Sequence, residues 1–387
     1  MLMPEQFTYR EMAKYARSTV RDCMKMGRNS DGHFESVWIL FNETEPSCET
    51  FSRMVEQECW RVGAHTIVES FTSERSKLSR SLTPDESLSE INPISTGLAS
   101  IVDATMFIGG HDNPSWASGV ADKVKLGAPT RTKVNSLIDE RKVKWLYFGW
   151  PLPGAAKAYH VGLQKFRRIF FNSIRASFSK KTLRLVKYYK QALHGKKEVR
   201  VTAEDGTDLV FEISGRPILM DDGILSKEDI ETGATGLNIP SGEAFVAPLE
   251  TTANGKLKLD ESFIEPFGKV RGLTAHFQEG KIVDFKAVSG GEAFRKFLDS
   301  NTGDKDRIAE LGIGCNAGAE YTGGSIIIDE KIYGTIHIAV GNNEGIFKGT
   351  NKASSHLDLV KDMRRGNLYA DGELIMRNGI PTNNNTT

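Results

Sequence analysis

The chain has 387 residues, and its 50 lysines and arginines balance its 50 aspartates and glutamates, so that the formal net charge is +0. This balance argues against a protein held to nucleic acid or to an anionic membrane by a general positive field. With 39% hydrophobic residues the chain can bury a core in each of two domains, but no window approaches the roughly 20 apolar residues of a membrane helix.

The N-terminal residues and the cysteines indicate the compartment. Residues 1–20 have neither the long apolar run nor the cleavage site of a signal peptide, and their pattern is typical of an amphipathic helix. The four cysteines show no short paired spacing, so we expect neither a zinc knuckle nor a disulfide framework. A cytoplasmic protein is the simplest expectation.

The first part of the chain alternates apolar segments with helical stretches. Their apolar residues run continuously, as in strands that helices cover on both faces. A helix is expected from Ser47 to Gly63, between the first two strands. The alternation predicts a doubly wound parallel sheet in an α/β, Rossmann-like domain over residues 1–195. The predicted strands are Ser36–Asn42, His65–Phe71, Ala104–Gly110 and Lys144–Trp150.

A basic helical stretch closes this domain. No acidic residue occurs from Arg141 to Lys197, and twelve lysines and arginines lie between Lys157 and Lys197. Aromatic and aliphatic residues interleave at helical spacing, so the stretch fits either an anion-binding patch or a pair of amphipathic helices. Without a recognised nucleic-acid motif, we favour the helices and expect no nucleic-acid partner.

The second half, residues 196–387, has a sequence pattern typical of β-hairpins. Alternating strands flank Asp205-Gly206, Glu279-Gly280 and Asp371-Gly372, and one helix is expected in Gly290–Asn301. This pattern predicts a mixed, antiparallel-rich α+β domain.

Four segments of this half place acidic or imidazole groups among small and apolar neighbours. His356 and Asp358 are two residues apart and would share one face of a strand, while Leu357 and Leu359 pack behind. By the same rule, His337 shares a face with Thr335 and Ala339. The site candidates are Glu243, Glu310, Glu330, His337, His356 and Asp358.

Two imidazoles and four carboxylates form a mixed ligand set that suits zinc, cobalt, manganese or iron. Carboxylates crowded in this number repel one another unless cations neutralise them, and the set could hold two bridged divalent ions. Taken singly, a glutamate beside glycine is more often a surface residue, and a strand histidine is more often a core residue than a ligand. His111, in a loop after a predicted strand, fits either a turn residue or an acid–base group.

These segments, in this order, resemble the thermophilic aminopeptidase family of metal-dependent exopeptidases. The resemblance rests on "WLYFGWPLPGAAKAY", "VTAEDGTDLVFEISGRP", "NIPSGEAFVAP", "AELGIG", "HIAVG" and "SSHLDLV", and it covers nearly the whole chain. It implies a two-metal site with Glu243, Glu310, His337, His356 and Asp358 as ligands and Glu330 as a further carboxylate. Glu310 and Glu330 would be the catalytic carboxylates. It also implies a homodimer that removes the N-terminal residue of short peptides.

One position departs from the family. The peptidases carry an oxyanion-stabilising tyrosine seven residues past the first of these histidines, where this chain has Glu344. The interval from His337 to His356 is also short for a peptidase. The loop resembles instead relatives such as 2,5-dihydroxypyridine dioxygenase, a mononuclear Fe(II) ring-cleaving enzyme, or a metal-dependent aromatic hydrolase. Two histidines and a carboxylate suit iron(II) as well, so a small aromatic substrate stays an alternative to a peptide.

Overall fold

The computed structural model describes residues 7–383 and contains two compact units. Unit 1 comprises the described residues up to Phe171 together with Gly223–Ile239, and unit 2 comprises Asn172–Asp222 and the described residues from Pro240 onward. The expected boundary at residue 195 lies inside unit 2, and its role as the limit of an independently folding domain stays a prediction.

Unit 1 is built on one five-stranded sheet in the order β2-β1-β3-β4-β8, and every neighbouring pair is parallel. The predicted strands are present as β1 (Ser36–Asn42), β2 (His65–Phe71), β3 (Ala104–Gly109) and β4 (Lys144–Gly149). The sequence did not predict the fifth strand, β8 (Gly236–Ile239), which returns from the second half of the chain to pair with β4.

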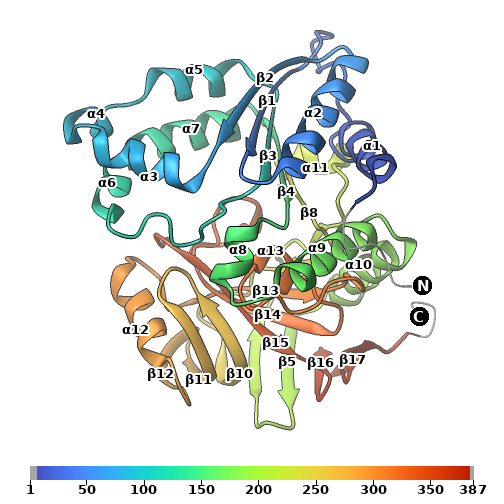
Figure 1. The fold of residues 1–387 in the computed structure, drawn as a ribbon. Coiled ribbons are helices and arrows are strands. Elements are labelled where there is room, and N and C mark those ends of the chain that lie inside the picture. The colour runs from blue at the N-terminus through green and yellow to red at the C-terminus, as the bar shows by residue number, and fades with distance from the viewer. Residues whose placement is uncertain (1–6, 384–387) are drawn as a thin grey trace. The chain divides into compact units, whose positions relative to one another are not determined.

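Helices lie on both faces of this sheet, because successive crossovers run first towards β2 and then back towards β4. In Figure 1, α2 lies on one side of the sheet and α5 and α7 lie on the other. The predicted helix after β1 is α2, although it begins one residue before Ser47. The helices of unit 1 are α1 (Tyr9–Ser18), a π-helical turn η1 (Thr19–Cys23), α2 (Pro46–Arg61), α3 (Ser73–Leu82), α4 (Asp85–Ser89), α5 (Pro93–Ile101), α6 (Ala121–Leu126), α7 (Ala128–Glu140), α8 (Pro153–Ala158) and α11 (Lys227–Thr232).

The two faces are not equally buried. On β1, Val37, Ile39 and Phe41 are fully buried, whereas Trp38 and Leu40 between them are half-buried. The continuous apolar run therefore overstated the burial of the second face, although the predicted fold class is confirmed.

Unit 2 contains two sheets, in which all strand pairs are antiparallel. The larger has the order β12-β11-β10-β6-β5-β16-β17-β18, and the smaller has the order β15-β14-β13-β9-β7. The strands are β5 (Glu198–Ala203), β6 (Asp208–Glu212), β7 (Leu219–Asp221), β9 (Glu243–Val246), β10 (Asn254–Ile264), β11 (Gly268–Gln278), β12 (Lys281–Lys286), β13 (Ile308–Gly314), β14 (Thr335–Gly341), β15 (His356–Asp362), β16 (Gly366–Ala370), β17 (Glu373–Arg377) and β18 (Ile380–Pro381).

The three predicted hairpins are present in the larger sheet and connect β5 to β6, β11 to β12 and β16 to β17. Both residues of the Glu279-Gly280 and Asp371-Gly372 turns have positive φ, as tight hairpin loops require. The predicted helix is α12 (Gly291–Ser300). The other helical segments are α10 (Lys180–Leu193), α13 (Ile326–Asp329) and the 3₁₀ turn η2 (Gly345–Phe347), while α9 (Leu163–Ser177) runs from unit 1 into unit 2.

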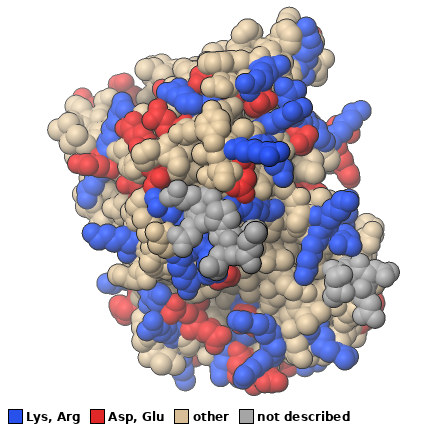
Figure 2. Space-filling view, turned by 45° about the vertical axis from the view of Figure 1, so that its right-hand side comes forward, with Lys and Arg blue, Asp and Glu red and all other residues tan. Residues whose placement is uncertain are grey.

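One hydrophobic core joins the two sheets and α10. Helix α10 buries Leu185, Val186, Tyr189 and Leu193 in this core, so its lysines and arginines form the opposite, solvated face of an amphipathic helix. On the face shown in Figure 2, basic and acidic side chains are interspersed, and that face carries no broad area of one sign. None of the described helices has the length and apolar character needed to cross a bilayer.

Candidate metal centre

The register of the smaller sheet brings the predicted residues to one face. On strand β14, which lies between β13 and β15, Ala339 pairs with Glu310 of β13 on one side and with Asp358 of β15 on the other. Directly paired residues point to the same side of a sheet, and so do residues two apart on one strand. His337 and His356 therefore join Glu310 and Asp358 on this face, as the spacing predicted.

Small residues make room for these side chains. Gly312 pairs with His337, and a Cβ on Gly312 would lie 2.0 Å from the imidazole Nε2. Gly314 pairs with Glu243 of β9, which puts Glu243 on the same face. Gly242, just before Glu243, has φ +127° and would place a Cβ 2.8 Å from Thr182. The glycines of both motifs therefore serve close approach at the wall of the site.

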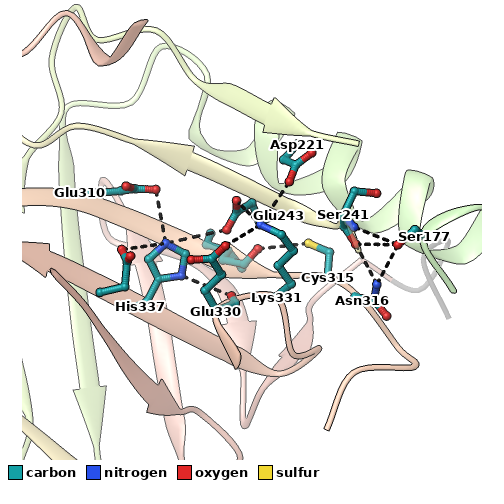
Figure 3. Close-up of polar contacts among 12 residues, drawn as sticks. Ser177, Asp221, Ser241, Glu243, Glu310, Cys315, Asn316, Glu330, Lys331 and His337 are labelled. Carbon is teal, nitrogen blue, oxygen red and sulfur yellow. Dashed lines mark hydrogen bonds and ion pairs between the residues drawn. The ribbon is translucent and has the colours of Figure 1, made fainter. Parts of the chain in front are cut away.

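Four groups converge at the centre of the face. His337 Nε2 lies 3.3 Å from Glu310 Oε1 and 3.8 Å from Asp358 Oδ1. His356 Nε2 lies 3.2 Å from Glu310 Oε2 and 3.2 Å from Asp358 Oδ1. The two carboxylates thus stand between the two imidazoles (Figure 3 shows His337 facing Glu310).

A backbone carbonyl oxygen fixes the orientation of each imidazole through its Nδ1 atom. His337 Nδ1 lies 3.3 Å from the carbonyl oxygen of Glu330, and His356 Nδ1 lies 2.8 Å from that of Asn342. A carbonyl can only accept, so Nδ1 carries the proton in both rings. In a neutral ring Nε2 then presents its lone pair to the carboxylates, an arrangement that requires a proton or a cation between them.

The charges of the cluster reinforce this requirement. Burial lowers the pKa of His337, but the hydrogen bond and negative charge of Glu310, together with Asp358 and Glu243, outweigh it and raise the pKa to about 10. The pKa of His356 is raised well above its usual value in the same way. Burial would raise the pKa of Asp358, but the charge and hydrogen bond of His356 hold it at about 2. The carboxylates thus favour a positive charge at both Nε2 atoms.

A lysine that the sequence analysis did not single out stands beside this centre. Lys331 is fully buried, and its Nζ lies 2.7 Å from Glu243 Oε1, 2.7 Å from Glu330 Oε1 and 3.1 Å from Asp221 Oδ2. Asp221, also not predicted, pairs with Glu243 across β7 and β9. Figure 3 shows the ammonium of Lys331 pointing between the carboxylates of Glu243 and Asp221.

The side chains at the centre fit a divalent metal ion. One ligand atom from each of Glu310, His337 and Asp358 lies within 4.8 Å of the others, and His356 adds a fourth donor. Glu243 Oε2 is buried, has no hydrogen-bond partner among the described residues and lies 3.8 Å from His337 Nε2. A cation would satisfy such an orphaned carboxylate oxygen beside a fixed imidazole.

Comparison with known proteins shows the family. The family model described as thermophilic metalloprotease (M29) matches residues 9–380. The chain belongs to this metalloprotease family. The chain is also similar to named aminopeptidases. Aminopeptidase T of Thermus thermophilus is 24% identical over 85% of this chain and 90% of its own length. Aminopeptidase AmpS of Bacillus subtilis is 23% identical over 45% of this chain and 47% of its own length, so that match spans about half of the relative.

Solved structures share the fold of this metalloprotease. Wild-type AmpT from Thermus thermophilus superposes with a TM-score of 0.73 at 20% identity and covers 97% of this chain and 99% of that one. The 2,5-dihydroxypyridine dioxygenase from Pseudomonas putida KT2440 superposes with a TM-score of 0.62 at 14% identity, over 97% of this chain and 98% of that one. At these identities the likeness shows the fold alone.

The loop after β14 carries Glu344, the residue for which the resemblance implied a tyrosine in the peptidases. Glu344 is half-exposed, accepts a hydrogen bond from Asn342 at 3.3 Å and lies 3.8 Å from Lys352. Three residues later, Phe347 stacks on the His356 imidazole with the ring centroids 5.8 Å apart. The loop therefore covers His356 with an aromatic ring, which the sequence analysis did not foresee.

His111 lies in unit 1. Its ring packs among aromatic rings, with centroids 5.0 Å from Trp116 and 5.5 Å from Phe71, and burial lowers the pKa of the imidazole. His111 is therefore part of an aromatic cluster of unit 1, and its role as a turn residue or as an acid–base group stays a prediction.

Proposed function

We propose that this metalloprotease is a metal-dependent aminopeptidase, which removes the N-terminal residue of short peptides with a metal-activated water. The observation that carries the proposal is the fixed direction of the two imidazoles, each held at Nδ1 by a carbonyl and aimed at Nε2 into the carboxylates of Glu310 and Asp358. The family and the names of the relatives support the same chemistry.

The metal would be held by Glu310, His337, His356 and Asp358. Such an ion, whether Zn²⁺, Co²⁺ or Mn²⁺, supplies a Lewis acid for the scissile carbonyl and lowers the pKa of water towards neutrality. Gly312 and the carbonyls of Glu330 and Asn342 hold the donors in place. This support raises the basicity of the imidazoles and fixes their tautomer.

Glu330 is the candidate for proton transfer. Burial raises the pKa of its carboxyl group, against the lowering effect of the Lys331 charge. A carboxylate with a raised pKa can take the proton that the attacking water loses and return it to the departing amine nitrogen. Lys331 donates to Glu330 Oε1 at 2.7 Å and so orients the carboxylate.

A second candidate function keeps the centre and changes the reaction. Two histidines and one carboxylate, here His337, His356 and Asp358, are also the ligand types of iron(II) oxygenases, and Glu344 stands where the peptidases have their tyrosine. On this proposal Fe(II) and dioxygen would open a dihydroxylated aromatic ring, or a divalent ion would hydrolyse an aromatic substituent.

Metal-dependent turnover tests the proposal. The purified protein is stripped with a chelator, reloaded with Zn²⁺, Co²⁺, Mn²⁺ or Fe²⁺, and assayed on leucyl-anilide and on dihydroxypyridine with and without oxygen. Oxygen-independent release of the amine with a hydrolytic metal is expected. Ring cleavage that requires oxygen and Fe²⁺, with no peptide turnover, would replace the proposal by its alternative.

A matched pair of variants tests the site. His356→Ala should abolish turnover and lower the metal content while the thermal unfolding temperature changes little. His276→Ala, at an exposed strand histidine of the same unit, should retain both turnover and metal. Unchanged metal content in His356→Ala would remove His356 from the centre.

Two further properties are proposals: the family resemblance motivates the first, and the N-terminal residues and cysteine spacing motivate the second. We expect a homodimer, which light scattering of the purified protein would detect, and a cytoplasmic location, which cell fractionation would check.

A further inference from the structure

Lys331 is an internal cation of the acidic cluster. Its side chain has 0% exposure, its Nζ donates hydrogen bonds to Glu243 and Glu330 at 2.7 Å, and it forms an ion pair with Asp221 Oδ2 at 3.1 Å. A buried ammonium is costly unless it is paired and fully hydrogen-bonded. Here two hydrogen bonds and a third carboxylate compensate the charge, so the ammonium is an integral part of the site.

The backbone holds this lysine in place. The Lys331 N–H donates to the Ile328 carbonyl at 3.0 Å, and the Lys331 carbonyl accepts from the Asn316 N–H at 2.8 Å. A Cβ on Gly314 would lie 2.8 Å from the carbonyl carbon of Lys331 and 2.1 Å from the Ile332 carbonyl oxygen. The backbone of Lys331 is therefore packed closely against Gly314, and its side chain is completely buried.

The ammonium divides the carboxylates into two groups. Three of them turn an oxygen towards Lys331, and the other two, Glu310 and Asp358, lie between His337 and His356. Glu243 joins the groups, because its Oε1 accepts from Lys331 and its Oε2 faces His337 at 3.8 Å. A divalent ion bound by Glu243 and Glu330 would have to share these carboxylates with a positive charge, and like charges at this range repel strongly in a buried site.

We propose that the ammonium of Lys331 takes the place of a second metal ion, so that each chain binds one divalent ion, at Glu310, His337, His356 and Asp358. This inference rests on the proposed metal centre. The number of carboxylates predicted two ions per chain, and the position of Lys331 reduces that number to one. One ion is sufficient for hydrolysis, since catalytic zinc sites commonly use a single ion with an open position for water. Lys331 acts here as a positioning residue for Glu243 and Glu330.

Counting ions tests the inference without any substrate. The stripped full-length protein is titrated with Zn²⁺ by calorimetry, and elemental analysis of the desalted product gives the ions per chain. One ion per wild-type chain is expected. Lys331→Ala removes the ammonium and leaves a cavity lined by three carboxylates, so this variant should bind a second ion. Mn²⁺-loaded protein adds an independent signal, because electron paramagnetic resonance distinguishes an isolated ion from a spin-coupled pair.

A matched control shows whether the effect is specific to Lys331 or follows from removing any buried lysine. Lys361 is also buried, donates to Asp205 at 2.7 Å and lies outside the cluster, so Lys361→Ala should still bind one ion. Two ions of similar affinity in the wild type would overturn the inference, and so would a folded Lys331→Ala that binds one ion. If Lys331→Ala does not fold, the wild-type count alone decides.

The outcomes separate this inference from the proposed function. One ion per chain with no peptide turnover rejects the aminopeptidase and keeps the role of Lys331. Two ions with peptide turnover keep the aminopeptidase and reject the role of Lys331.

Discussion

The imidazole of His337 lies directly against Gly312 on the neighbouring strand, where a Cβ would come within 2.0 Å of both Cε1 and Nε2. The pairing of β13 and β14 fixes this relationship, because Gly312 is the register partner of His337. A side chain at residue 312 and the observed imidazole position are therefore mutually exclusive.

Gly312→Ala should weaken metal binding by about 10- to 100-fold, the range found when the support of a ligand is lost. The added methyl group overlaps the observed position of the His337 ring, so the ring must leave the place where Nε2 faces Glu310. Calorimetric titration with Zn²⁺ measures the loss. Gly97→Ala, in helix α5 with open space around it, is the control and should bind the metal as the wild type does. Equal affinity in both variants would show that the strands yield to the methyl group.

The loop over His356 is held by one buried carboxylate. Glu250 Oε1 accepts from Asn343 Nδ2 at 3.1 Å and from the Thr350 N–H at 2.7 Å, and Oε2 accepts from Arg216 Nη2 at 2.6 Å. These bonds tie both ends of the segment that carries Phe347. The segment is therefore held on the metal centre by charge-assisted bonds.

Glu250→Gln should raise KM several-fold and leave the metal content unchanged. The amide cannot accept as strongly from Arg216 and Asn343, so the segment with Phe347 loosens, while the four proposed ligands keep their supports. Steady-state assays and elemental analysis measure the two quantities. Glu373→Gln removes an exposed ion pair with Lys196 and should change neither. A loss of metal in Glu250→Gln would mean that the loop contributes to the ligand geometry.

Local periodicity was sufficient for four of the five strands of unit 1, the hairpins and the faces of β14 and β15. Ile336, Ile338 and Val340 pack into the core while His337 faces the site, as the two-residue period predicted. The strand register, and the return of the chain to the first sheet as β8, could not be predicted from local sequence patterns. Strand β8 pairs with β4 although about 90 residues separate them.

Lys331 could not be identified from the sequence because nothing local marks a lysine as buried. It follows Asp329 and Glu330 and looks like the end of an exposed charged turn, whereas the structure surrounds it with carboxylates from β7 and β9. Asp221 was missed for the same reason. One physical rule could have pointed to Lys331. Several carboxylates buried together need a positive charge beside them, and a lysine of the same chain can supply it.

An ion pair away from the centre, between the buried Lys361 and the exposed Asp205, gives a pH prediction. Burial would raise the pKa of Asp205, but hydrogen bonds from Lys361 and Thr207 outweigh it and lower the pKa below its usual value. A lowered pKa in the folded state means that this pair stabilises the protein above the unfolded pKa and loses that contribution as the pH falls through the folded value. Asp205→Asn should therefore lower the unfolding temperature at pH 7, and its difference from the wild type should shrink in acid below the ordinary range of aspartate.

Calorimetric unfolding at neutral and acidic pH measures this difference. Asp260→Asn, at an exposed position of β10, is the control and should give no such trend. A difference that stays constant down to the acid limit would show that Asp205 acts through the turn at Gly206 and not through its charge.

The last prediction concerns the residue that departs from the peptidase pattern. Glu344→Tyr should raise peptide turnover about tenfold or more, because a phenolic O–H can donate to the developing oxyanion whereas a carboxylate repels it. The acidic group contacts Asn342 and Lys352 at the edge of the site, so its removal should leave the metal content unchanged. Glu344→Phe keeps the ring and lacks the donor, and should not share the gain. Turnover on leucyl-anilide at equal metal loading compares the three proteins. If tyrosine and phenylalanine gave the same rate, the gain would come from removing the charge, and residue 344 would have no part in stabilising the oxyanion.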